Sequence, residues 1–365
     1  LRLEGAQLVY RSVPFAQEVV YQGLMPQQVQ LTVEGMRVLP ACVDRMDPLL
    51  TFLEGSLLEG VETSPFRSGA TGPSLAVRLF SPEGSPERRA YLWLGDNYHR
   101  LQAGVRWREQ RERFSWASAV TFRLGSAYRT GNALTPGIPA PSYTPMRDST
   151  LSLPSFRKLN LYTALSWEIS SLHQLAVRYL GDYFYNVAYP ALIMDARHSA
   201  MHLVSLEHRW GHFSKLRVYG STVFHDMTDE TRTPEEIRTR IVMPGMYMPM
   251  KGLTRTAGVV QELTWWAGEK GQLRQRTEAV YNYASATMNM FPLDGGAPMH
   301  LANLAAIRFW QKGSFIEGSY RVGRFFLEGE GGLAHFAYSV RDTVGFLPLR
   351  LYQQAYGGGA QPVRS

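Results

Sequence analysis

Two short segments of the sequence carry side chains suited to a soft metal ion. In Pro40-Ala-Cys-Val-Asp-Arg-Met-Asp-Pro48, the thiol of Cys42 and the thioether of Met46 lie four residues apart in what we expect to be a tight loop. Thiol and thioether sulfur favour Cu(I), whereas zinc sites combine cysteine with histidine or carboxylate. A buried cysteine packed beside a methionine gives the same spacing, so the motif needs a partner segment.

The segment His225-Asp-Met227 offers that partner. Residues two apart on a strand project to the same side, so the imidazole of His225 and the thioether of Met227 would point together. In the strand expected from Phe213 to Met227, apolar Leu216 and Val218 occupy the opposite phase. This phase predicts that His225 and Met227 face the interior of a barrel. A loop-edge histidine beside a packing methionine is the alternative.

Methionine is also dense in a third segment, Val242-Met-Pro-Gly-Met-Tyr-Met-Pro-Met250, and Met288 and Met290 follow later. Weak, exchangeable thioether contacts at Met243, Met246, Met248 and Met250 would form a track that passes a soft ion inward. A flexible apolar loop gives the same composition, and both interpretations stay open.

Composition excludes several other classes of function. The formal net charge is +7, but Arg and Lys are scattered singly, which argues against a nucleic-acid partner. A single cysteine, Cys42, rules out an internal disulfide framework. The chain has no Gly-x-Ser-x-Gly elbow, phosphate loop or His-Glu-x-x-His motif, so we do not expect an enzyme. The histidines at 198, 202, 208 and 212 are expected to mix both faces of a strand and its turn.

The elements expected to position these residues are long β-strands. No apolar run reaches the roughly 18 to 20 residues of a membrane-spanning helix, whereas a barrel strand needs only about 9 to 11. Residues Leu159–Trp167 alternate strictly, with apolar Leu165 and Trp167 on one face and Asn160 and Ser166 on the other. This pattern is typical of a transmembrane barrel strand, and a soluble all-β sandwich is the alternative.

Turns and loops recur between these strands. Short turns are expected at Ser170-Ser171, Gly211-His212, Gly268–Gly271 and Gln311–Ser314, and longer polar loops at Thr130–Ser149 and Thr228–Pro249. Before about residue 80 the strands are shorter, and Val29–Val33 and Met36–Leu39 are expected to form a hairpin around Glu34-Gly35. The sequence therefore predicts a small β unit followed by a barrel.

Longer stretches resemble TonB-dependent outer-membrane receptors. The segment from Gly23 to Arg37, with its core Gln28-Val-Gln-Leu-Thr-Val-Glu-Gly-Met-Arg37, is similar to the plug of that family. The continuation through Ala41–Pro48, together with Tyr189–Asp195 and Met246–Met250, resembles the copper receptor branch. The resemblance implies that Cys42 and Met46 are plug ligands and that His225 and Met227 are barrel-wall ligands.

The family resemblance implies an all-β fold, a transmembrane β-barrel with an N-terminal plug domain. We assign residues 1–79 to the plug and residues 80–365 to the barrel. We expect both to be incomplete in this chain, because a family barrel has about twenty-two strands of roughly 10 residues plus loops. The implied setting is the outer membrane of a Gram-negative bacterium, in contact with the lipid bilayer and lipopolysaccharide.

The implied function is import of a copper ion, as Cu(I), energised by the TonB complex of the inner membrane. One alternative keeps the receptor fold but carries a metal chelate or cobalamin. A second is a structural or adhesive outer-membrane barrel subunit with an inert plug.

Overall fold

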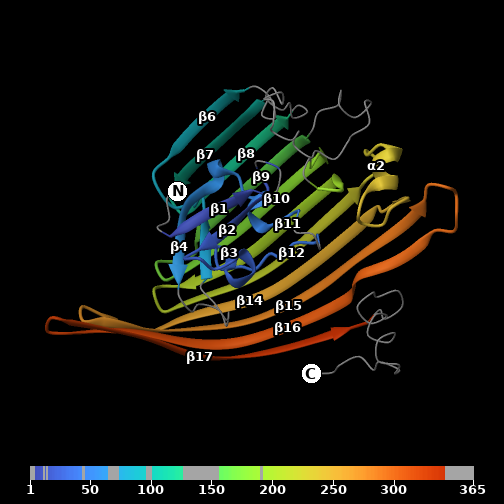
Figure 1. The fold of residues 1–365 in the computed structure, drawn as a ribbon. Helices are drawn as coiled ribbons and strands as arrows, with labels where there is room; N and C mark the ends of the chain where they lie inside the picture. The colour runs from blue at the N-terminus through green and yellow to red at the C-terminus, as the bar shows by residue number, and fades with distance from the viewer. Residues whose placement is uncertain are drawn as a thin grey trace.

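A computed structural model describes residues 5–10, 13, 15–42, 46–64, 74–95, 101–125, 156–189 and 192–341. Figure 1 shows a broad, curved, antiparallel sheet, with small N-terminal strands lying within its curve. We call the large sheet the wall and residues 5–80 the N-terminal unit. The wall face that meets the N-terminal unit is the inner face, and the opposite face is the outer face.

The wall is an up-and-down meander in which each long strand pairs with the next along the chain. Its strands are β6 (Glu87–Leu94), β7 (Leu101–Arg111), β8 (Phe114–Gly125), β9 (Phe156–Glu168), β10 (His173–Val187), β11 (Asp195–Trp210), β12 (Ser214–Thr228), β14 (Met250–Gly268), β15 (Gly271–Pro292), β16 (Met299–Val322) and β17 (Phe325–Val340), and the short β13 (Met246–Tyr247) pairs with β15. Among the described residues the sheet is open, with β6 and β17 at its edges.

The N-terminal unit contains two small sheets. β1 (Ala6–Tyr10) pairs with β2 (Gln17–Tyr21), and β3 (Gln30–Val33), β5 (Ser74–Leu79) and β4 (Leu58–Ser64) form a three-stranded sheet in that order. Three 3₁₀ turns, η1 (Pro26–Gln28), η2 (Leu49–Phe52) and η3 (Gly55–Leu57), connect them. The change from small sheets to the wall falls between β5 and β6, and the division into plug and barrel domains at residue 80 stays a prediction.

Strand faces follow the expected alternation. On β9, Asn160 and Ser166 are buried on the inner face, whereas Leu165 and Trp167 are 54% and 42% exposed on the outer face. The exposed side of this strand is therefore its apolar side, the reverse of a soluble sheet and the pattern expected of a barrel wall. β12 behaves in the same way, with Val218 exposed and the following odd-numbered positions buried.

The expected short turns at 170–171, 211–212 and 268–271 are confirmed by the strand ends on either side of them. The expected turn at Gln311–Ser314 is wrong, because β16 runs through it and ends only before Gly323, where φ is 58°. Gln311 is buried on the inner face. The sequence alone therefore did not distinguish polar residues on the inner face of a strand from a turn.

The expected hairpin in the N-terminal unit is half correct. The tight turn at Glu34-Gly35 is present, with φ of 53° and 76° and paired backbone hydrogen bonds between Val33 and Met36. Residues 36–39 do not form its second strand; β3 instead pairs in parallel with β5, from more than forty residues later.

The longer loops differ in what can be described. The loop between β12 and β14 holds a short helix, α2 (Pro234–Thr239), capped by the Thr233 side chain, which accepts from the Glu236 N–H. The expected loop at 130–149 lies outside the described residues. Within the described part of the chain, no helix is long and apolar enough to cross a membrane.

Charged side chains dock the N-terminal unit on the wall. Arg37 forms an ion pair with Glu278 at 2.7 Å, and Arg276 donates to the Gly35 carbonyl at 3.0 Å. Arg217 donates to the Glu34 carbonyl, so two wall arginines hold the tight turn by its backbone. We call these six residues, Glu34, Gly35, Arg37, Arg217, Arg276 and Glu278, the charged seam.

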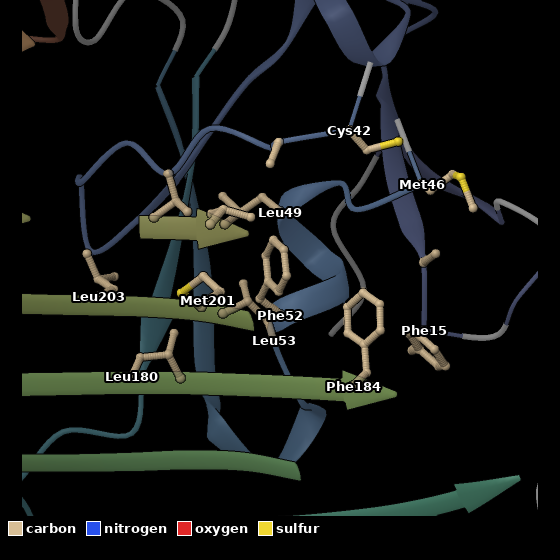
Figure 2. Packing of buried hydrophobic residues seen from close by; sticks show 14 of the residues in the cluster. Phe15, Cys42, Met46, Leu49, Phe52, Leu53, Leu180, Phe184, Met201 and Leu203 are labelled. Carbon is tan, nitrogen blue, oxygen red and sulfur yellow. The ribbon is translucent and has the colours of Figure 1, made fainter. Parts of the chain in front are cut away.

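The larger of two hydrophobic clusters in the described residues spans the N-terminal unit and the wall. Figure 2 shows Phe15, Phe52, Cys42 and Met46 of the N-terminal unit packed near Phe184 of β10. The Phe15 and Phe184 rings lie 5.8 Å apart, and those of Phe52 and Phe184 lie 6.4 Å apart. This shared core fixes where the Cys42 segment meets the wall.

Candidate metal site

Asp47 folds the segment that carries the first sulfur ligands. Its carboxylate is buried and accepts hydrogen bonds from the backbone N–H groups of Ala41 and Cys42, each at 3.0 Å. These bonds close the loop, so that Cys42 and Met46 are both held in the core, 4% and 1% exposed. Residues 43–45 between them lie outside the described residues.

The Cys42 thiol meets the wall at Met227. The Cys42 Sγ and Met227 Sδ atoms are 3.3 Å apart, and Met227 is fully buried. A thiol and a thioether from segments 185 residues apart therefore converge, one from the N-terminal unit and one from β12. This contact brings together one member of each predicted pair.

His225 lies two residues before Met227 on the same inner face of β12 and is also fully buried. Its Nδ1 atom is 3.8 Å from Asp47 Oδ2, and among the described residues neither ring nitrogen has a hydrogen-bond partner. Buried polar nitrogens are rarely left without a partner. An imidazole with both nitrogens unsatisfied, two residues from the Met227 thioether on one strand face, is suited to donate one lone pair to a metal ion.

The backbone of Met46 is held by the segment that follows β10. The Tyr189 hydroxyl donates to the Met46 carbonyl at 3.0 Å, and the Tyr189 N–H donates to Asp195 at 2.8 Å. Arg232, fully buried, pairs with the same Asp195 carboxylate at 2.7 Å. The loops after β10 and β12 are thereby joined to the backbone of a predicted ligand.

A glycine on β14 lets the loop approach the wall. Gly252 is directly opposite His225 in the sheet, and a Cβ at Gly252 would lie 2.2 Å from the Ala41 carbonyl oxygen. Two residues along, the Thr254 hydroxyl donates to the Pro40 carbonyl at 2.9 Å. Any larger residue at 252 would push the Cys42 segment away from His225.

The methionine-rich segment lies against the same core. Met248 and Met250 are buried in it, Met246 packs on it half-buried, and Met243 is 36% exposed. Met250 is the cross-strand neighbour of Met227 and, on its other side, of Met288. Thioethers thus run from the exposed loop towards Met227, and the transfer role of this track stays a prediction.

No group of three or more His, Cys, Asp or Glu side chains in the described residues is placed to hold a metal ion. A site here therefore depends on methionine sulfur, which narrows the candidate ions to soft ones. Burial raises the pKa of Asp47 to about 7, against the lowering effect of the backbone N–H groups of Ala41 and Cys42.

Sequence reasoning missed three contributors to this geometry. Asp47 lies in the segment that carries Cys42 and Met46, but no function was predicted for it. An acidic side chain can close a loop by accepting hydrogen bonds from backbone N–H groups. Tyr189 was noted only within a family-like segment. Gly252 could not be singled out from the sequence, because a glycine within a strand can mark a bulge, a bend or a close approach of another backbone.

The histidines of β11 are arranged differently from the prediction. His198, His202 and His208 all lie on the outer face of β11, so they do not mix faces as predicted. His208 stacks on His173, whose ring also stacks on Trp210 at the turn end, as in an interfacial aromatic belt.

No protein-family model and no curated protein matches the chain. Solved structures do match it. "Copper transporter OprC" matches with a TM-score of 0.71 at 16% identity, covering 93% of this chain and 51% of that chain. FpvA of P. aeruginosa, in complex with an iron pyoverdine, matches with a TM-score of 0.55 at 9% identity, covering 99% and 49%.

The ferric citrate transporter FecA matches with a TM-score of 0.61 at 9% identity, covering 93% of this chain and 53% of that chain. The chain spans about half the length of the solved structures that it matches. At such identities the likeness concerns the fold. The chain therefore has the fold of the TonB-dependent outer-membrane receptors.

Proposed function

We propose that the intact protein is an outer-membrane transporter that imports copper as Cu(I), bound by Cys42, Met46, His225 and Met227. The observation that carries the proposal is the 3.3 Å contact of Cys42 Sγ with Met227 Sδ beside a fully buried His225 that has both ring nitrogens unsatisfied among the described residues. Three sulfurs and one imidazole make a donor set that prefers Cu(I).

Burial of the ligands favours a bare ion over a chelate. The four side chains are at most 4% exposed, whereas a siderophore or cobalamin needs an open cavity lined by aromatic and polar groups. The likeness to FpvA bound to an iron pyoverdine and to the ferric citrate transporter FecA keeps the fold compatible with chelates. The sulfur contact favours copper.

The outer face of the wall supports an outer-membrane location. Large apolar residues are exposed along it, for example Val177, Leu206 and Val259. A contiguous apolar surface of this kind is covered by lipid in a barrel. In this setting the TonB complex of the inner membrane would supply the energy for moving the N-terminal unit and releasing the ion.

The test is anaerobic Cu(I) titration of the purified protein with elemental analysis, comparing wild type with Cys42→Ser and His225→Ala. We expect near-stoichiometric copper in wild type. In both variants the Cu(I) affinity should fall by more than the roughly 10- to 100-fold that removal of a residue hydrogen-bonded to a metal ligand costs. Met299→Leu, at an exposed methionine, is the matched control and should bind as wild type.

Uptake by cells that express these variants extends the test to transport. Copper accumulation should fall when Cys42 and His225 are both replaced. Unchanged accumulation in that double variant contradicts the proposal, and tighter binding of an iron chelate than of Cu(I) would favour the chelate receptor.

A further inference from the structure

A groove on the outer face of the wall combines a polar end with an apolar floor. It has a volume of about 410 Å³ and crosses β11, β12 and β14. Its polar end is formed by His202, Thr222 and Arg255, which are cross-strand neighbours in one row. The groove lies on the face opposite the copper site, since Thr254, next to Arg255, contacts the N-terminal unit.

The apolar floor is one row closer to the tight turns. Val204, Gly220 and Ala257 are consecutive cross-strand neighbours there, and Tyr281 follows Ala257 on β15. Gly220 leaves the floor low, because a Cβ at that position would meet no atom closer than the Thr256 carbonyl oxygen, at 3.8 Å. A low apolar channel beneath a polar row has the shape of a site for an acyl chain with its headgroup.

The polar row lies at the loop-side edge of the expected membrane band. His202, Thr222 and Arg255 are eight to ten residues from Trp210, Phe213 and Trp265, the aromatic residues at the tight-turn ends of their strands. A spanning strand needs about 9 to 11 residues between its two interfaces. The row therefore lies where the headgroups of the outer leaflet would be.

Arg255 is exposed, and among the described residues no carboxylate forms an ion pair with its guanidinium. The row continues through Tyr283 to a second arginine, Arg308, two strands away. Neighbouring strands are about 4.8 Å apart, so the two guanidinium groups start from backbones roughly 10 Å apart. One acid, Asp226, lies four residues beyond Thr222 along β12, opposite Lys251.

We propose that this groove binds a diphosphorylated glycolipid of the outer leaflet, with phosphate on Arg255 and an acyl chain along Gly220 and Ala257. Guanidinium groups bind phosphate through paired, charge-assisted hydrogen bonds, and two arginines on one row suit a headgroup with two phosphates. Tyr283 lies between the two arginines and Thr222 flanks Arg255 on its other side, so both hydroxyl-bearing residues are placed for sugar contacts. The inference rests on the outer-membrane location proposed above and does not depend on copper.

The test is native mass spectrometry and titration of the detergent-purified protein with diphosphoryl lipid A in mixed micelles. We expect Arg255→Gln to weaken binding about tenfold or more, because a charge-assisted contact is lost. Gly220→Leu should weaken binding by filling the floor, and Arg255→Lys should retain part of it. The matched control is Lys312→Gln, an exposed cation of β16 outside the groove.

Cu(I) binding by the same variants separates the two proposals. Arg255→Gln should bind copper as wild type, which also shows that the variant is folded. Lipid A binding that is unchanged in Arg255→Gln and Gly220→Leu, or phosphatidylglycerol binding as tight as that of lipid A, overturns the glycolipid site. Failure of wild type to bind copper, with lipid A binding still dependent on Arg255, would overturn only the copper proposal.

Discussion

Two of the regions in which the N-terminal unit meets the wall differ in their chemistry. In the charged seam, Arg37, Arg217 and Arg276 satisfy carboxylates and backbone carbonyls across the interface. Around Cys42 the contact is apolar and sulfur-rich, and His225 has donor capacity that no described residue uses. The charges of the seam are paired within the protein, whereas the sulfur region leaves both ring nitrogens of His225 without a hydrogen-bond partner among the described residues.

This difference assigns separate tasks to the two regions. Paired charges fix the position of the N-terminal unit, because breaking a buried pair leaves an uncompensated charge. The sulfur region then needs only soft, exchangeable bonds, since its geometry is already held by Asp47, Gly252 and Tyr189. Variants in one region should therefore affect docking, and variants in the other should affect copper.

The largest effect is expected from Glu278→Ala. Glu278 is 1% exposed and pairs with both Arg37 and Arg276, so its loss should destabilise docking by about 3–5 kcal/mol. Hydrogen exchange of backbone amides in residues 30–37 should accelerate accordingly. Protection equal to wild type would contradict the docking role of the seam. Arg274→Ala, which removes a half-exposed pair with Glu317, is the control.

Gly252→Ala should come next. The added Cβ overlaps the Ala41 carbonyl, and overpacking of this kind costs about 1–3 kcal/mol. We expect Cu(I) affinity to fall while exchange in residues 30–37 stays protected. Gly318→Ala is the control, because its Cβ would make only an ordinary contact with Leu273 at 3.4 Å. Equal Cu(I) affinities in both variants would show that close approach at Gly252 is unimportant.

Asp47→Asn should lower Cu(I) affinity by about 10- to 100-fold, the range for outer-shell partners of a metal. The Ala41 and Cys42 N–H groups donate to different carboxylate oxygens, and in the amide one of these positions becomes an NH2 group that cannot accept. Isothermal titration with a competing Cu(I) chelator measures the change. A variant that binds like wild type would remove Asp47 from the account.

The smallest effect is expected from Tyr189→Phe. It removes one neutral hydrogen bond to the Met46 carbonyl, worth about 0.5–1.5 kcal/mol. Cu(I) affinity should fall a few-fold, with a faster dissociation rate in stopped-flow measurements. Tyr185→Phe, on the outer face of β10 four residues before Tyr189, is the control. An effect as large as that of Asp47→Asn would mean that the loops contribute more than a single bond.

Much of the wall could be predicted from sequence because its two faces differ chemically. Period-two alternation placed Leu165 outward and Asn160 inward, and the same phase placed His225 and Met227 on the inner face. Alternation did not predict the strand where polar residues on the inner face resemble a turn, as at Gln311. It also failed where pairing depends on distant segments, as between β3 and β5.

The candidate site divides in the same way. Residue type and resemblance predicted two ligand pairs, Cys42 with Met46 and His225 with Met227. The structure places one sulfur of each pair, those of Cys42 and Met227, in contact. The residues that hold them were not found, because Asp47 acts by accepting from backbone N–H groups and Gly252 acts by having no side chain. The ligand atoms can be predicted from residue types, whereas the positions of those atoms depend on the fold.

X-ray absorption spectroscopy of the Cu(I)-loaded protein tests the central claim most directly. The account predicts a copper shell of sulfur scatterers with one imidazole nitrogen, from which His225→Ala removes the nitrogen and Cys42→Ser removes one sulfur. A shell of oxygen and nitrogen alone, or spectra unchanged in both variants, would contradict a site shared between the N-terminal unit and the wall.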